Sequence, residues 1–131
     1  MKSLLYLLVL FTSFGYSQKN LFLKPDAVPD CNSMRNGTFV NSQYSEQEYH
    51  MVVKDGIQIE YIENGQYIKS KMEFISECEY KTTIIEVTIP DYFAKPGDFL
   101  TTRILETQSN YIKIKSVMFG QEYDFVYKKI K

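Results

Sequence analysis

Polar and apolar residues alternate with a period of two along most of the chain from Gly37 onward. Such alternation is typical of β-strands that have one buried face and one solvated face. The odd-numbered positions are apolar in residues 49–54, and they are apolar again in residues 57–61. The pattern predicts two neighbouring strands whose odd-numbered side chains, Tyr61 among them, face the core of the sheet.

Short turn signals separate the predicted strands. The Asp-Gly pair at 55–56 and the Asn-Gly pair at 64–65 tolerate positive φ at both central turn positions, so each predicts a tight type I′ hairpin. In residues 78–89 the alternation changes phase between residues 84 and 85, which predicts a β-bulge there. Residues 90–98 contain two prolines and a glycine and form the longest interruption of the pattern.

The whole pattern predicts an all-β fold. About eight strands, each joined to the next by a short turn, form an antiparallel up-and-down meander. Closing the meander into a small barrel, or a half-open one, protects its edges, so we favour a barrel over a flat sheet. A two-sheet sandwich with Greek-key crossings is the alternative, and only residues 90–98 could supply a long crossing.

The chain begins with a segment typical of a signal peptide. A short basic start precedes an apolar run too brief to span a bilayer, and small residues at 15 and 17 suit a signal peptidase that cleaves before Gln18. We therefore expect a signal peptide at 1–17, an irregular segment at 18–36 and a single barrel domain at 37–131. The protein is expected to be secreted or periplasmic, with no membrane span after cleavage.

Cys31 and Cys78 are the only cysteines in the sequence. An exported chain meets oxidising conditions, so the simplest pairing is one disulfide, which would tie the irregular N-terminal segment to the middle of the domain. A metal site is disfavoured, because two cysteines and the single His50 cannot complete a four-ligand zinc shell. No cofactor motif is present either.

Several positions resemble those of lipocalin-like, or calycin-type, β-barrel proteins. Those proteins open with Gly-x-Trp and carry a basic residue late in the chain that packs over the Trp; here Gly37 matches the glycine, Phe39 takes the place of the Trp, and Lys128 takes that of the basic residue. The chain is also similar to a group of small exported bacterial proteins with a Cys...Gly-x-Phe...Cys-x-Tyr pattern. The residues that carry this second similarity are Cys31, Gly37, Phe39, Cys78 and Tyr80. The resemblance implies a barrel.

Charge and motifs exclude some functions. The net charge is -1, which gives no basic field for a phosphate backbone, so we expect no nucleic-acid partner. His50 is interpreted as a surface or rim residue, and the carboxylate pairs at 46 and 48 and at 77 and 79 as solvated faces beside turns. An enzyme that uses His50 and a carboxylate at the barrel mouth is a distant alternative, and the main prediction is that the protein is not an enzyme.

Methionine and aromatic side chains on the predicted inner faces suggest a ligand. Flexible thioethers and hydroxyl-bearing rings suit an adaptable apolar pocket, and a barrel of about eight strands can be filled or can hold one small molecule. We therefore expect a binding protein for a small apolar or amphipathic ligand. Its candidate interior residues are Met51, Tyr61, Met72, Phe74, Met118, Phe125 and Tyr127.

The rival hypothesis is a structural or protein-interaction module of the cell envelope. In that case the barrel core is filled, and an outer patch or the loop at 90–98 contacts a partner protein. This hypothesis predicts that Tyr92 and Phe93 are exposed. The sequence identifies no such partner.

Overall fold

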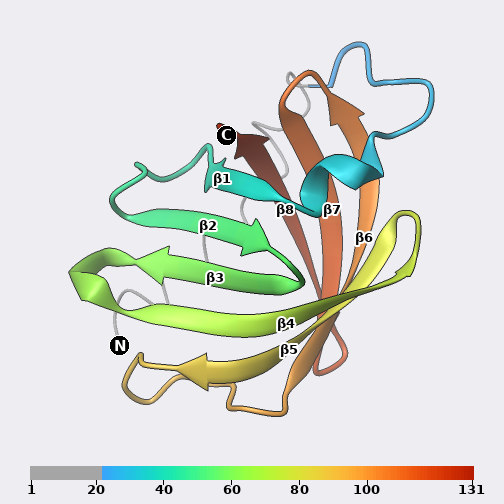
Figure 1. Ribbon diagram of the computed structural model, residues 1–131. Helices are drawn as coiled ribbons and strands as arrows, with labels where there is room; N and C mark the ends of the chain where they lie inside the picture. Colours follow the sequence, from blue (N-terminus) through green and yellow to red (C-terminus); the bar gives the residue numbers. More distant parts are fainter. Residues whose placement is uncertain (1–21) are drawn as a thin grey trace.

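The computed structural model describes residues 22–131, which form one closed antiparallel β-barrel (Figure 1). Each strand pairs with the next along the chain, and β1 pairs with β8 to close the barrel. The predicted all-β meander is confirmed, in its closed form. The strands are β1 (Gly37–Asn41), β2 (Tyr49–Lys54), β3 (Ile57–Ile62), β4 (Tyr67–Ser76), β5 (Glu79–Val87), β6 (Phe99–Gln108), β7 (Tyr111–Met118) and β8 (Gln121–Lys129), with short 3-10 helices η2 (Cys31–Met34) and η3 (Glu63–Gly65).

The Asp-Gly pair forms the predicted two-residue turn. Asp55 and Gly56 have φ angles of 53° and 78°, and the residues on either side of them, Lys54 and Ile57, are paired. The Asn-Gly pair at 64–65 also has positive φ at both positions, 69° and 75°. Its turn is longer than predicted, because η3 includes Glu63 as well.

The two-residue turn fixes which face of β3 points into the barrel. Directly opposed residues of an antiparallel pair lie on the same face of the sheet. Met51 is opposite Glu60, and Val53 is opposite Gln58. Met51 and Val53 are buried in the core, so Gln58 and Glu60 also point inward.

Tyr61 consequently lies on the outside of the barrel, and its predicted interior position is wrong. It is opposite His50 of β2, and the two rings stack with centroids 4.8 Å apart. The apolar alternation of β3 thus marks its outer face, and the polar positions of this strand are the inner ones.

The predicted bulge in β5 is confirmed. Ser70 pairs with Ile84 and Lys69 pairs with Glu86, which leaves Ile85 without an opposite residue. The extra residue changes the phase of the strand, so Val87 comes to lie opposite the buried Ile68.

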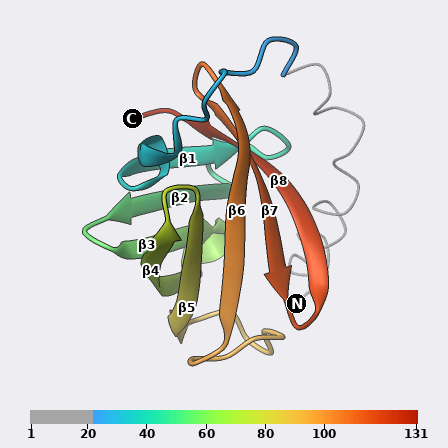
Figure 2. The ribbon, with the colours of Figure 1, turned by 90° about the vertical axis from the view of Figure 1, so that its right-hand side faces the viewer.

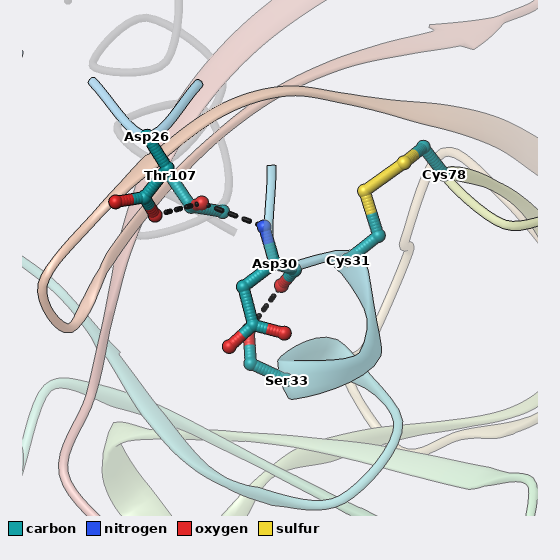
Figure 3. The surroundings of a disulfide bond; sticks show 6 residues. All are labelled: Asp26, Asp30, Cys31, Ser33, Cys78 and Thr107. Carbon is teal, nitrogen blue, oxygen red and sulfur yellow. Dashed lines mark hydrogen bonds between the residues drawn. A yellow bond between two sulfur atoms is a disulfide. The ribbon is translucent and has the colours of Figure 1, made fainter. Parts of the chain in front are cut away.

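The segment before β1 runs beside the β6–β7 hairpin (Figure 2). Thr107 holds it at two points: its hydroxyl donates to Asp26 Oδ2 at 2.6 Å and accepts from the backbone N–H of Asp30 at 2.8 Å (Figure 3). Residues 18–36 were predicted to be irregular, and the described part from residue 22 has only η2 as regular structure. The predicted signal peptide at 1–17 lies outside the described residues.

The disulfide between Cys31 and Cys78 is present, as predicted, with Cα atoms 5.2 Å apart (Figure 3). It joins η2 to the turn between β4 and β5. Together with the Thr107 contacts it holds the N-terminal segment across one end of the barrel.

That end of the barrel is closed by packed side chains. Met34 of η2 and Phe39 of β1 are both fully buried. Lys129, which is opposite Phe39, places its ammonium 5.8 Å from the Phe39 ring centroid and donates to the carbonyl of Ser33 at 2.9 Å. Gly37 is required beside it, because its φ is 144° and a Cβ there would lie 2.6 Å from the Lys131 carbonyl oxygen.

The basic residue that packs over Phe39 is therefore Lys129. The resemblance had assigned this role to Lys128, which is wrong. Successive side chains of a strand point to opposite faces. Lys128 is exposed, and its ammonium lies on the outside near the Tyr111 ring, 5.8 Å from its centroid.

Candidate ligand cavity

A partly enclosed cavity lies inside the barrel, toward the end opposite η2. Its volume is about 90 Å³. That is well above the roughly 10–15 Å³ that a cavity needs to hold one water, so the cavity can admit a small molecule. Its lining comes from β3 to β8 and from the loop between β5 and β6. The lining residues are Gln58, Glu60, Ile68, Ser70, Tyr80, Thr82, Ile84, Tyr92, Phe93, Leu100, Thr102, Ile114, Ser116, Met118, Tyr123, Phe125 and Tyr127.

The lining mixes apolar side chains with polar groups from neighbouring strands. Tyr80, Thr102 and Ser116 are directly opposite one another across β5, β6 and β7. The hydroxyls of Thr102 and Ser116 are 2.8 Å apart, and Tyr80 hydrogen-bonds Thr102. These buried polar groups therefore have partners, as buried polar groups require.

Glu60 brings the only carboxyl group to this lining. The hydroxyl of Tyr49 donates to Glu60 Oε1 at 2.7 Å, and Gln58 makes a second side-chain hydrogen bond to Glu60. The hydroxyl of Tyr127 lies 3.3 Å from that of Tyr49. Because the Tyr49 proton points to Glu60, Tyr127 is the donor in this second contact when Glu60 is ionised.

Burial controls the protonation of this group. Desolvation raises the pKa of the Glu60 carboxyl above its ordinary value, and the hydrogen bonds from Tyr49 and Gln58 offset only part of that rise. Desolvation also raises the pKa of Tyr49 and of Tyr127 well above the ordinary value, and the Glu60 charge raises both further. Both phenols are therefore neutral at physiological pH.

The raised pKa of Glu60 predicts a specific pH dependence of stability. The folded protein binds the Glu60 proton more tightly than the unfolded chain does. Protonated Glu60 therefore contributes its full stabilisation below pH 4.5, the ordinary pKa, and this stabilisation is lost as the pH rises through the folded-state pKa. The side chain in the Glu60→Gln variant cannot ionise, so the variant does not lose stability in this way. Its amide oxygen can still accept the hydrogen bond from Tyr49. We expect the variant to gain stability over the wild type as the pH rises, with the difference disappearing toward acid pH.

The measurement is urea unfolding across the pH range, with Glu73→Gln as control. Glu73 lies on the outer face of β4, where its exposed side chain is paired with Lys71 at 3.8 Å. The control variant should follow the wild type at every pH. A Glu60→Gln variant that is less stable than the wild type at alkaline pH would contradict the assignment.

The loop at residues 88–98 covers one side of the cavity. Its backbone is fixed to β5, since Ile84 N–H donates to the Asp98 carbonyl at 2.9 Å and Gly97 N–H donates to the Ile84 carbonyl at 2.9 Å. Tyr92 and Phe93 then reach the lining, with ring centroids 4.6 Å apart. Phe93 remains 44% exposed, so it lies at the rim.

The predicted interior residues fall into three groups. Met118, Phe125 and Tyr127 line the cavity. Met51, Met72 and Phe74 lie on inner faces of β2 and β4 but outside the lining, as part of the packing toward the closed end. Tyr61 is on the outer surface.

The other predicted chemical residues lie away from the cavity. His50 is on the outer face of β2, where its Nδ1 lies 3.1 Å from the Glu46 carbonyl oxygen. Glu48 caps the turn before β2: its carboxylate accepts from Ser45 N–H at 2.9 Å, and this backbone hydrogen bond lowers the pKa of Glu48. Neither His50 nor Glu48 belongs to the lining.

Other kinds of site were sought in the same part of the chain. Within residues 22–131, no three His, Cys, Asp or Glu side chains are grouped so that they could hold a metal ion. Over that same range, no helix has the length and apolar character needed to cross a membrane. Comparisons of the chain with protein-family models, with curated proteins and with solved structures found no significant match.

Proposed function

We propose that this protein is an exported, lipocalin-like binding protein that holds a small amphipathic molecule inside its barrel and catalyses no reaction. The observation that carries the proposal is the partly enclosed cavity, which combines apolar walls with a few buried polar groups. Ligand sites commonly have this composition, because apolar surface supplies affinity and a few polar groups fix orientation.

The lining indicates the kind of molecule. Ile68, Leu100 and Met118 offer apolar contact, and Phe125 offers an aromatic face. Glu60 stands in the same lining with acceptor positions that Tyr49 and Gln58 do not fill, so a wholly apolar ligand would leave it poorly solvated. A ring or short chain with one polar group fits best.

Export is part of the proposal. The Cys31–Cys78 disulfide is compatible with an extracytoplasmic location, because such bonds persist in oxidising compartments. A secreted or periplasmic protein with a signal peptide at 1–17 would meet its ligand outside the cytoplasm.

Filling the cavity should abolish binding. Leu100 is partly exposed and lines the cavity, so the larger side chain of Leu100→Trp can occupy that space without breaking the barrel. With 2-phenylethanol as probe, we expect titration calorimetry to show at least a tenfold loss of affinity. Thr101→Trp is the control, because the side chain of the next residue points to the opposite face.

The rival function is a protein-interaction module. Of the two side chains that it predicted to be exposed, Tyr92 is half-buried in the cavity lining and Phe93 is exposed, and further exposed aromatic side chains favour it. Phe93, Phe99 and Phe119 are 44%, 51% and 62% exposed, and the rings of Phe93 and Phe119 lie edge to face with centroids 6.4 Å apart. Equal probe affinity in the Leu100→Trp and wild-type proteins, or no binding to either, would overturn the ligand-binding proposal in favour of this one.

A further inference from the structure

Among the described residues that line the cavity, none is a basic partner for Glu60. The lining contains no Lys, Arg or His, and the only salt bridge within the described range joins Lys71 to Glu73 on the outside. The groups that hydrogen-bond Glu60, Tyr49 and Gln58, are both uncharged. A buried carboxylate without a cation is costly, and the cost is relieved when a cation binds beside it.

We propose that the ligand is a small hydrophobic amine whose ammonium group pairs with the Glu60 carboxylate. The inference rests on the proposed binding function and specifies its ligand class.

The neighbourhood of Glu60 suits an ammonium group. An ionised carboxylate has about four acceptor positions, and Tyr49 and Gln58 fill two of them. An ammonium group brings three donors for the remaining positions. Tyr80 and Tyr127, which both interact electrostatically with Glu60, line the same cavity and offer aromatic surface to the rest of the ligand.

The same groups disfavour ligands whose polar group is an anion or a neutral alcohol. A carboxylate or phosphate would face Glu60 as a like charge in a poorly solvated site, where repulsion is strong. A neutral alcohol could donate a hydrogen bond to Glu60, but the negative charge of the Glu60 carboxylate would stay uncompensated. The binding affinity should therefore be highest for the amine, lower for the alcohol and lowest for the acid.

The test uses three probes that carry an amine, an alcohol or a carboxylate on the same phenylethyl group: 2-phenylethylamine, 2-phenylethanol and 3-phenylpropionate. Calorimetric titration of the wild type at neutral pH should show the amine binding most tightly. Glu60→Gln should weaken amine binding about 10- to 100-fold, the usual range for a charged hydrogen bond, and change alcohol binding less than about threefold. Glu73→Gln is the matched control, and thermal unfolding establishes that both variants are folded.

The outcomes separate this inference from the binding function. If the alcohol or the acid binds the wild type as tightly as the amine, or if Glu60→Gln keeps full amine affinity, the amine assignment is overturned and ligand binding stands. If none of the three probes binds, the proposed function fails and the inference fails with it.

A pH series adds a second readout. Four tyrosines interact electrostatically with Glu60: Tyr49 of β2, Tyr80 of β5, Tyr127 of β8 and Tyr92 of the 88–98 loop. Burial raises the pKa of each phenol, so all four stay neutral below about pH 8. Amine affinity should therefore increase as the pH rises above 4.5, the ordinary pKa, and Glu60 ionises, and the Glu60→Gln variant should show no such increase. Parallel profiles for the two proteins would overturn the assignment.

Discussion

Replacing both cysteines with alanine is expected to lower the free energy of unfolding by about 4 kcal/mol. Cys31 and Cys78 are separated by 47 positions, and the chain-entropy model assigns about 4 kcal/mol to a closed loop of that size. Small domains have a net stability of only about 5–15 kcal/mol, so the loss is a large fraction of the total. Urea unfolding of the Cys31→Ala, Cys78→Ala double variant measures it.

The control is the wild type unfolded in the presence of a thiol reductant. It should match the double variant, and the double variant itself should not respond to the reductant. Thr107 still binds Asp26 and Asp30 in the variant, and Lys129 still donates to Ser33, so the N-terminal segment stays attached to the barrel. A loss below about 1 kcal/mol would show that these hydrogen bonds hold the segment and that the disulfide adds little.

Much of the fold could be predicted because each local signal has one structural solution. Two residues that accept positive φ, as in Asp55-Gly56, allow a tight turn, and the phase change at Ile84-Ile85 requires an extra residue in one strand. With only two cysteines in the sequence, one intramolecular pairing was possible. These signals depend on neighbours in sequence and need no knowledge of packing.

Glu60, the charged group of the candidate site, was missed for a reason that the sequence could have shown. Polar inner positions in β3 look like a solvated face when the strand is considered alone. A two-residue turn at 55–56, however, places residue 60 opposite residue 51, so an inward Met51 requires an inward Glu60. The error at Tyr61 came from treating the two strands independently.

The cavity itself could not be predicted from the sequence. Whether a small barrel is filled or hollow depends on how side chains from several strands meet, and on where a loop such as 88–98 places Tyr92 and Phe93. Three of the candidate interior residues, Met118, Phe125 and Tyr127, line the cavity, and a pattern of alternation cannot distinguish them from inward residues near the closed end such as Met72.

Phe39→Ala is the second large effect that we expect. Phe39 is fully buried, lies beneath the Lys129 ammonium and meets the Tyr127 ring edge to face with centroids 6.3 Å apart. Truncating a buried phenylalanine removes its transfer free energy and leaves a cavity, which together cost about 3–5 kcal/mol. Because Met34 and the disulfide close the same end, the segment before β1 should also lose protection against hydrogen exchange.

Phe99→Ala provides the matched control, since it makes the same substitution on the outer face of β6. Phe99 is 51% exposed and its ring makes a cation–π pair with the Lys81 ammonium, 4.4 Å from the ring centroid, so its loss should cost less than about 1 kcal/mol. Urea unfolding of both variants with the disulfide intact gives the comparison. If the two losses are equal, Phe39 is not the packing centre of the closed end, and closure depends on η2 and its disulfide instead.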